Sequence, residues 1–135
     1  MKKILFIIAL SIVFVSCKKS DISIKNVTDS WELVREIGMD RNQTFAPGSG
    51  NLLKLNADKT YSRFTNNQQV SSGTYYLGTV AAKGTKAFDV IYFSEYSGPT
   101  KIRTAADSLI LSTPPNDANG NMIMDGGTSI YIRQK

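Results

Sequence analysis

From Trp31 to the C-terminus, hydrophobic and polar residues alternate in short runs that are separated by Gly, Asn, Asp and Pro. This period of two is typical of strands that bury one face, and no window keeps the 3.6-residue period of a helix. The pattern predicts eight strands, at residues 31–37, 52–55, 60–65, 70–77, 87–93, 100–104, 108–112 and 128–133. Short sequential strands favour an all-β fold, an up-and-down antiparallel β-barrel or half-barrel of about eight strands.

The alternation also assigns side chains to the faces of single strands. In residues 31–37, Trp31, Leu33, Arg35 and Ile37 fall on one side. Glu32 and Glu36 fall on the other side, which we interpret as the outer face. Residues 87–93 are apolar at both parities, which predicts a strand that is covered on both faces.

The first 16 residues have the pattern of a signal peptide. Lys2 and Lys3 precede an apolar run, residues 4–15, which only Ser11 interrupts. As a helix this run spans about 18 Å, well short of the roughly 30 Å hydrocarbon core of a bilayer. We therefore expect residues 1–16 to be a secretory signal peptide and not a transmembrane helix.

The sequence Phe14-Val15-Ser16-Cys17 resembles the lipobox of bacterial lipoproteins, although that motif more often has leucine where Phe14 stands. The resemblance implies that Cys17 receives a diacylglycerol and that the chain is cut before it. The alternative is a plain signal peptide followed by a chance cysteine. Cys17 is the only cysteine of the chain and stands at the one place where lipidation can use it.

A lipidated Cys17 makes the membrane a partner of this protein. Two or more acyl chains hold a protein stably on a bilayer, so we expect a lipid-anchored protein of the cell envelope, on the outer membrane. Residues 17–29 are polar and lack a clear period, which predicts the lipidated cysteine and a flexible tether. Residues 30–135 then form the barrel, one domain with one core.

Composition narrows the chemistry that is open to the chain. There is no histidine and a single cysteine, which excludes Ser-His-Asp and Cys-His catalysis, the usual zinc sites and an internal disulfide. The acidic residues are scattered singly apart from Glu32 and Glu36. We therefore expect no enzyme activity, no metal and no cofactor. The segment from Asp117 to Asn121 superficially resembles a calcium loop, but it lacks the glutamate of such a loop at its twelfth position, so we predict a turn.

The charge of the chain gives no indication of nucleic-acid binding. The formal net charge is +5, but Lys2 and Lys3 belong to the predicted signal peptide. Lys18 and Lys19 lie beside the anchor, where they face anionic head groups. The domain itself is nearly balanced, so we expect no nucleic-acid partner.

The order of short motifs in the mature part resembles the small lipocalin-like lipoproteins of the Bacteroidota. The pattern begins with a tryptophan strand, here Trp31-Glu32-Leu33-Val34, and a hairpin, here residues 52–61. A G-x-Y strand follows at Gly73-Thr74-Tyr75. The pattern ends with a D-S-L-x-L strand at Asp107-Ser108-Leu109-Ile110-Leu111 and a closing Y-x-R strand at Tyr131-Ile132-Arg133. The resemblance implies a ligand-binding scaffold without catalytic residues. Asp29 departs from it, because lipocalins have the glycine of a G-x-W motif at this place.

Lipocalins pack the tryptophan of the first strand under an arginine from the far end of the chain. The resemblance therefore implies that Trp31 and Arg133 form a structural pair that closes one end of the barrel. A cation over an indole ring contributes about 0.5–2 kcal/mol, depending on its desolvation. The alternative is that Arg133 is a solvated residue near the C-terminus.

Inward-facing aromatic and aliphatic residues are the candidates for a ligand site, because tyrosines combine apolar walls with hydroxyls that orient a ligand. We expect a small lipophilic or aromatic ligand to be lined by Leu33, Leu55, Tyr61, Phe64, Tyr75 and Tyr92. The alternative is core filling, because a barrel of about eight strands is just wide enough for its own side chains.

A second class of function stays open, an interaction module that docks on an envelope protein or a glycan through its rim loops. An empty cavity with apolar and tyrosyl walls would favour ligand binding. A filled interior with an exposed apolar patch at residues 79–85 or 96–99 would favour docking. In either case we expect a monomer.

Overall fold

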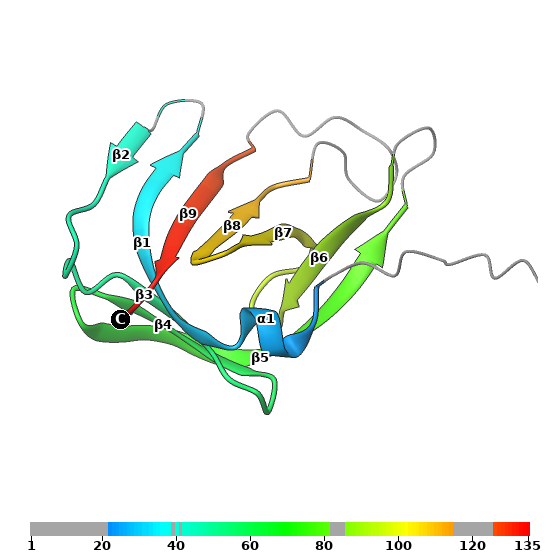
Figure 1. Cartoon of the computed structure of the whole chain (residues 1–135), viewed down its shortest axis with the longest axis horizontal. Coiled ribbons are helices and arrows are strands. Elements are labelled where there is room, and N and C mark those ends of the chain that lie inside the picture. The colour runs from blue at the N-terminus through cyan, green and yellow to red at the C-terminus, as the bar shows by residue number, and fades with distance from the viewer. Residues whose placement is uncertain (1–21, 39, 41, 82–85, 115–125) are drawn as a thin grey trace, which may run out of the picture.

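A computed structural model describes residues 22–38, 40, 42–81, 86–114 and 126–135 (Figure 1). The elements of these residues are α1 (Ile24–Val27), β1 (Asp29–Ile37), β2 (Asn42–Thr44), β3 (Leu52–Leu55), β4 (Thr60–Thr65), β5 (Gln68–Val80), β6 (Phe88–Phe93), β7 (Thr100–Ala105), β8 (Ser108–Ser112) and β9 (Thr128–Arg133). The predicted signal peptide, Cys17 and the segment from Asp117 to Asn121 lie outside the described residues.

The strands form one antiparallel sheet that closes on itself. Its order is β2-β1-β3-β4-β5-β6-β7-β8-β9, and β9 pairs in addition with β1. Eight strands therefore make a closed barrel, while β2 is an extra strand beside the upper half of β1. This confirms the predicted all-β, up-and-down barrel and is consistent with a lipocalin-like fold. Closure removes the two unpaired edges that an open meander would expose.

The predicted strands agree with the observed ones to within a few residues, and the differences have local causes. Asn66 and Asn67 both have positive φ angles, 50° and 63°. This is the geometry of a two-residue turn whose twist matches the flanking strands. Thr65 therefore pairs directly with Gln68, and β5 begins two residues earlier than the alternation predicts.

The domain also begins before the predicted boundary at residue 30. Val27 of α1 is fully buried in the core, and Ile22 packs against that core. The indole Nε1 of Trp31 donates a hydrogen bond to the carbonyl oxygen of Val27 over 2.7 Å. Residues 22–29, which the sequence assigned to the tether, are therefore part of the packed domain.

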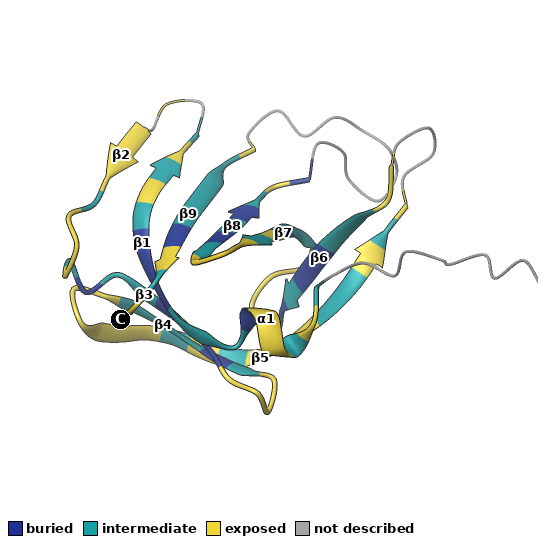
Figure 2. Cartoon of the chain, viewed as in Figure 1, coloured by how far each residue is buried: buried dark blue, intermediate teal, exposed yellow. Residues whose placement is uncertain are grey.

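Side chains fill the core of the barrel. Figure 2 shows the buried segments of the strands in dark blue. The members of this core that are at most 2% exposed are Val27, Trp31, Leu53, Leu55, Tyr61, Tyr75, Ile91, Phe93, Ile102 and Leu109. On β6, Val90 and Ile91 are both fully buried, although they point to opposite faces. This agrees with the prediction that residues 87–93 are covered on both faces.

A β-bulge changes the phase of β1 at its midpoint. Leu33 pairs with Tyr131 and Arg35 pairs with Ile130, so that Val34 is an extra residue in the ladder. Beyond a bulge, each side chain points to the face opposite to the one that simple alternation gives it. The prediction that Glu36 lies on the outer face is therefore wrong, because its side chain lines the barrel interior.

Candidate functional site

The two ends of the barrel differ, and we call the end where β1 begins the floor. Here strand pairing sets Trp31 opposite Arg133. The indole is fully buried, and the guanidinium carbon of Arg133 lies 4.9 Å from the centroid of its ring. The structure thus brings the two residues of the predicted pair together.

Two carboxylates hold Arg133 in this position. Asp29 accepts a hydrogen bond from its Nη1, and Asp107 lies 3.6 Å from its Nε. Asp29, which departs from the lipocalin motif, is therefore the ion-pair partner of the arginine that covers the tryptophan. The floor has a structural role, because its groups are paired with one another.

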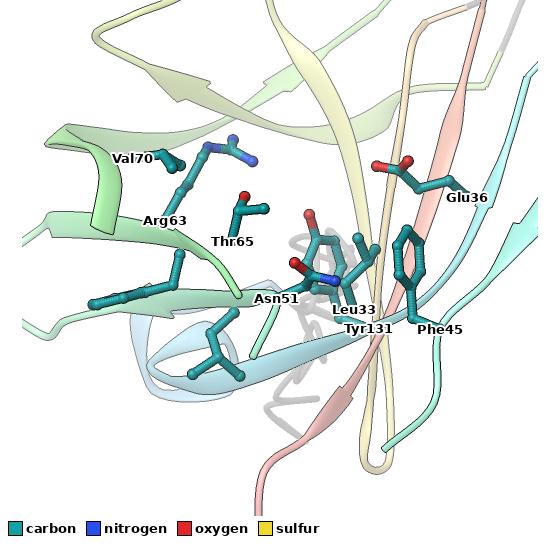
Figure 3. A pocket seen from close by; sticks show the side chains of 10 residues that line it. Leu33, Glu36, Phe45, Asn51, Arg63, Thr65, Val70 and Tyr131 are labelled. Carbon is teal, nitrogen blue, oxygen red and sulfur yellow. The ribbon is translucent and has the colours of Figure 1, made fainter. Parts of the chain in front are cut away.

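The opposite end, which we call the mouth, is hollow. Two adjoining cavities of about 260 Å³ and about 270 Å³ open here, and Arg63 and Tyr131 line both of them. Figure 3 shows the first cavity, to which the ends of β1, β4 and β5 and the segments before β3 contribute Leu33, Glu36, Phe45, Asn51, Thr65 and Val70. The second cavity lies on the other side of Arg63 and is lined by Phe93, Tyr96, Thr100, Leu111 and Ser129, among others.

The residues that the sequence proposed as ligand-lining fall into three groups. Leu33 and Phe64 are among the residues that line the first cavity, but Phe64 is on the opposite face of β4 from Arg63, and the Nζ of Lys54 lies 4.9 Å from the centroid of its ring. Leu55, Tyr61 and Tyr75 belong to the buried core, at most 2% exposed, and line neither cavity, so for these three the core-filling alternative describes the structure.

Tyr92 does not line the barrel interior, in contrast to its prediction as a ligand-lining residue. Its ring stacks on that of Tyr76, with centroids 4.3 Å apart and an angle of 8° between the planes. Tyr76 is 57% exposed, so this pair lies on the outer surface. The physical reason is parity, because the inward positions of β6 are taken by Ile91 and Phe93.

Arg63 is one of the site residues that sequence reasoning missed. It lies on β4 at the same parity as the buried Tyr61, and so it points inward. Its guanidinium carbon lies 4.6 Å from the ring centroid of Phe93 and 5.5 Å from that of Tyr96, while its Nε is 2.8 Å from Oε1 of Glu95. Aromatic faces and one carboxylate together compensate the cost of placing a cation inside a barrel.

Two pKa shifts describe the electrostatics of the mouth. Burial opposes the ionisation of Glu95, but the Ser71 hydroxyl and the Arg63 guanidinium together hold its pKa below the ordinary value. Burial raises the pKa of Tyr131, and the negative charge of Glu36 adds to this rise while Arg63 opposes it. The phenol of Tyr131 is therefore a protonated hydrogen-bond donor at neutral pH.

Glu36 and Arg63 bring opposite charges to the first cavity. Figure 3 shows the carboxylate of Glu36 and the guanidinium of Arg63 directed into the cavity from opposite sides. Among the described residues, Arg63 has an ion pair with Glu95 but none with Glu36. The alternation on β4 after Tyr61 was the signal for Arg63, whereas the bulge that turns Glu36 inward leaves no mark in the sequence.

The rim of the mouth exposes large hydrophobic side chains. Ile37 at the end of β1 is 38% exposed, Val70 near the start of β5 is 61% exposed, and Tyr96 after β6 is 55% exposed. Residues 82–85 of the predicted rim loop 79–85 lie outside the described residues. The mouth is therefore the end of the barrel that offers apolar contacts to another molecule.

Within the described part of the chain, no group of three or more His, Cys, Asp or Glu side chains could hold a metal ion. In the same part, no helix has the length and apolar character that crossing a bilayer requires. Comparison of the chain with protein-family models, with curated proteins and with solved structures gives no match.

Proposed function

We propose that this chain is a lipid-anchored protein of the cell envelope whose barrel binds a small lipophilic or aromatic ligand at its mouth, without catalysis. The observation that supports the proposal most is the contrast between the two ends. The floor is closed by Trp31 and its partners, whereas the mouth contains two cavities that meet at Arg63 and Tyr131. Concave sites with apolar walls and a few directed polar groups are typical of small-molecule binding.

The volumes limit the size of the ligand. Ligand pockets commonly measure about 300–1,000 Å³, and each cavity of the mouth lies just below that range, at about 260 and 270 Å³. Among the described residues, the filled core leaves no deep calyx for a long acyl chain. The proposed ligand therefore has one ring or a short aliphatic chain, which fits against Leu33 and Phe45.

The anchor is tested by the change Cys17→Ala in the full chain, expressed in a bacterium that lipidates proteins. We expect the wild type to incorporate labelled palmitate and the variant to lose the label, because the chain has no other thiol. A variant that keeps the label would contradict the proposed anchor.

Ligand binding is tested by native mass spectrometry of the full chain, purified from its own host in detergent. We expect the wild type to retain a small molecule, and Thr65→Trp to abolish retention because a large side chain then fills the first cavity. Arg103→Trp, at an exposed position of β7, is the matched control and should leave retention unchanged. Equal retention by all three proteins would place the molecule elsewhere, and a wild type that retains nothing would speak against the proposal.

The second candidate function is docking on a protein or glycan through the rim. It is supported by the exposure of Ile37, Val70 and Tyr96 around the mouth. The two functions differ in what the variant Tyr96→Ser does. Removing this exposed ring should abolish the capture of an envelope partner in a crosslinking experiment if the rim docks, and should leave retention of a small molecule in the first cavity unchanged.

A further inference from the structure

The first cavity holds an acid and a base that both face its interior and that are not paired with each other. Glu36 comes from the end of β1 and Arg63 comes from β4. Both line the cavity, yet no ion pair joins them among the described residues. The two opposite charges share a cavity of about 260 Å³ and do not form an ion pair with each other. The cavity therefore has room for a molecule between them.

The two charged groups are not equivalent. The Nε of Arg63 is bound to Glu95, and its flat face lies against Phe93. The guanidinium also has a side-chain hydrogen bond with Tyr131. An arginine has five N–H donors, so these two contacts still leave donors that can bind a second carboxylate. In Figure 3 the guanidinium end of Arg63 is turned towards the cavity that Glu36 enters from the other side. Arg63 is therefore a fixed anchor for an anionic group.

Glu36 offers the complementary site for a cation. It lines the same cavity as Phe45 and Tyr131. A carboxylate next to aromatic rings is a favourable environment for an ammonium group, since both the charge and the ring faces attract a cation. Glu36 raises the pKa of Tyr131 through its negative charge, in agreement with the position of both side chains at the same cavity.

We propose that the ligand of the first cavity is a zwitterion, an α-amino acid or a compound of the same dipolar type with an apolar side chain. Its ammonium group binds Glu36, its carboxylate binds Arg63, and its side chain lies against Leu33 and Phe45. This inference rests on the proposed ligand-binding function and names the chemical class of the ligand. An anionic ligand would leave the charge of Glu36 without an ion-pair partner in the cavity, and a cationic ligand would leave unused the donors of Arg63 that Glu95 does not occupy.

The test is isothermal titration calorimetry of the full chain in neutral detergent micelles with four probes. They are L-phenylalanine, the cationic L-phenylalanine amide, the anionic N-acetyl-L-phenylalanine and neutral benzyl alcohol. We expect L-phenylalanine to bind about tenfold more tightly than either singly charged probe, the size of one charged hydrogen bond. Equal affinity of the zwitterion and one singly charged probe would overturn the inference.

A variant of Glu36 tests the assignment of the cation site. Glu36→Gln should weaken binding of L-phenylalanine and of its amide by about tenfold and leave the N-acetyl compound unaffected. Arg35→Gln is the matched control, because this neighbouring side chain is exposed on the outer face, and it should bind all probes like the wild type. An unchanged affinity of Glu36→Gln for L-phenylalanine would overturn the assignment of the cation site.

The outcome also separates this inference from the proposed function. Binding of benzyl alcohol without any preference for the zwitterion would overturn the inference and leave the proposed small-molecule site intact. Absence of binding by all four probes would count against both. Circular dichroism of each variant shows whether the fold is intact, so that a loss of affinity is not mistaken for unfolding.

Discussion

Replacement of Trp31 by alanine tests the floor of the barrel. The side chain is fully buried, and its Nε1 donates the hydrogen bond to the carbonyl oxygen of Val27. Removing a large buried aromatic side chain costs about 3–5 kcal/mol, because transfer free energy is lost and a cavity remains. The variant also leaves the buried carbonyl oxygen of Val27 without its hydrogen-bond donor, so we expect a loss of unfolding free energy in the upper part of this range.

Such a loss is large for a domain whose total stability is about 5–15 kcal/mol. The free energy of unfolding is measured by urea denaturation, followed by far-ultraviolet circular dichroism because the variant has no tryptophan. Arg35→Ala, at an exposed position of the same strand, is the control and should change the stability by no more than about 0.5 kcal/mol. A Trp31→Ala protein within about 1 kcal/mol of the wild type would refute the account of the floor.

Three further predictions follow from local geometry. Arg133→Ala should cost only about 1 kcal/mol, because the cation is partly exposed, and should shift the fluorescence emission of Trp31; an unchanged spectrum would contradict their contact. Gly48→Ala should cost about 1 kcal/mol for its positive φ alone, whereas Gly50→Ala should cost about 2–4 kcal/mol because its Cβ would lie 2.6 Å from a backbone nitrogen of the β4–β5 turn. Equal melting temperatures of the two variants would contradict this. Burial raises the pKa of Tyr131, so its contribution to stability is complete below the unfolded pKa near 10 and is lost as the pH rises above it. The chain has six tyrosines, and exposed ones such as Tyr76 can ionise in the folded protein. The last part of the tyrosinate absorbance should therefore appear only together with loss of the β signal, and ionisation of all six tyrosines in a folded protein would disprove it.

The fold could be predicted from the sequence because alternation and turn residues act locally. The predicted β3 and β4 agree with the structure residue for residue, since the hairpin between them has Asp58 to bind the backbone N–H and hydroxyl of Thr60. β2 was missed because its three residues are all exposed and give no pattern of burial. The role of Val27 was missed because a single apolar residue in a polar stretch does not reveal what covers it.

The site was harder to predict than the fold, because the mouth is defined by residues that alternation places wrongly or that resemble surface residues. Glu36 turns inward only because Val34 forms a bulge against β9, a contact between strands far apart in the chain. Arg63 is inside because Phe93 and Glu95, about thirty residues later in the chain, receive its guanidinium. Aromatic character alone selected Tyr61, Tyr75 and Tyr92, of which the first two fill the core and the third lies outside.

The most direct test of the account is a nuclear magnetic resonance titration of the ¹⁵N-labelled full chain in neutral micelles with L-phenylalanine. The account predicts saturable chemical-shift changes at the backbone amides of Leu33, Phe45 and Tyr131, which line the first cavity. It predicts none at the indole N–H of Trp31, which is bound to Val27 at the opposite end. Changes centred on the indole, or the absence of any saturable change, would contradict a zwitterion site at the mouth of the barrel.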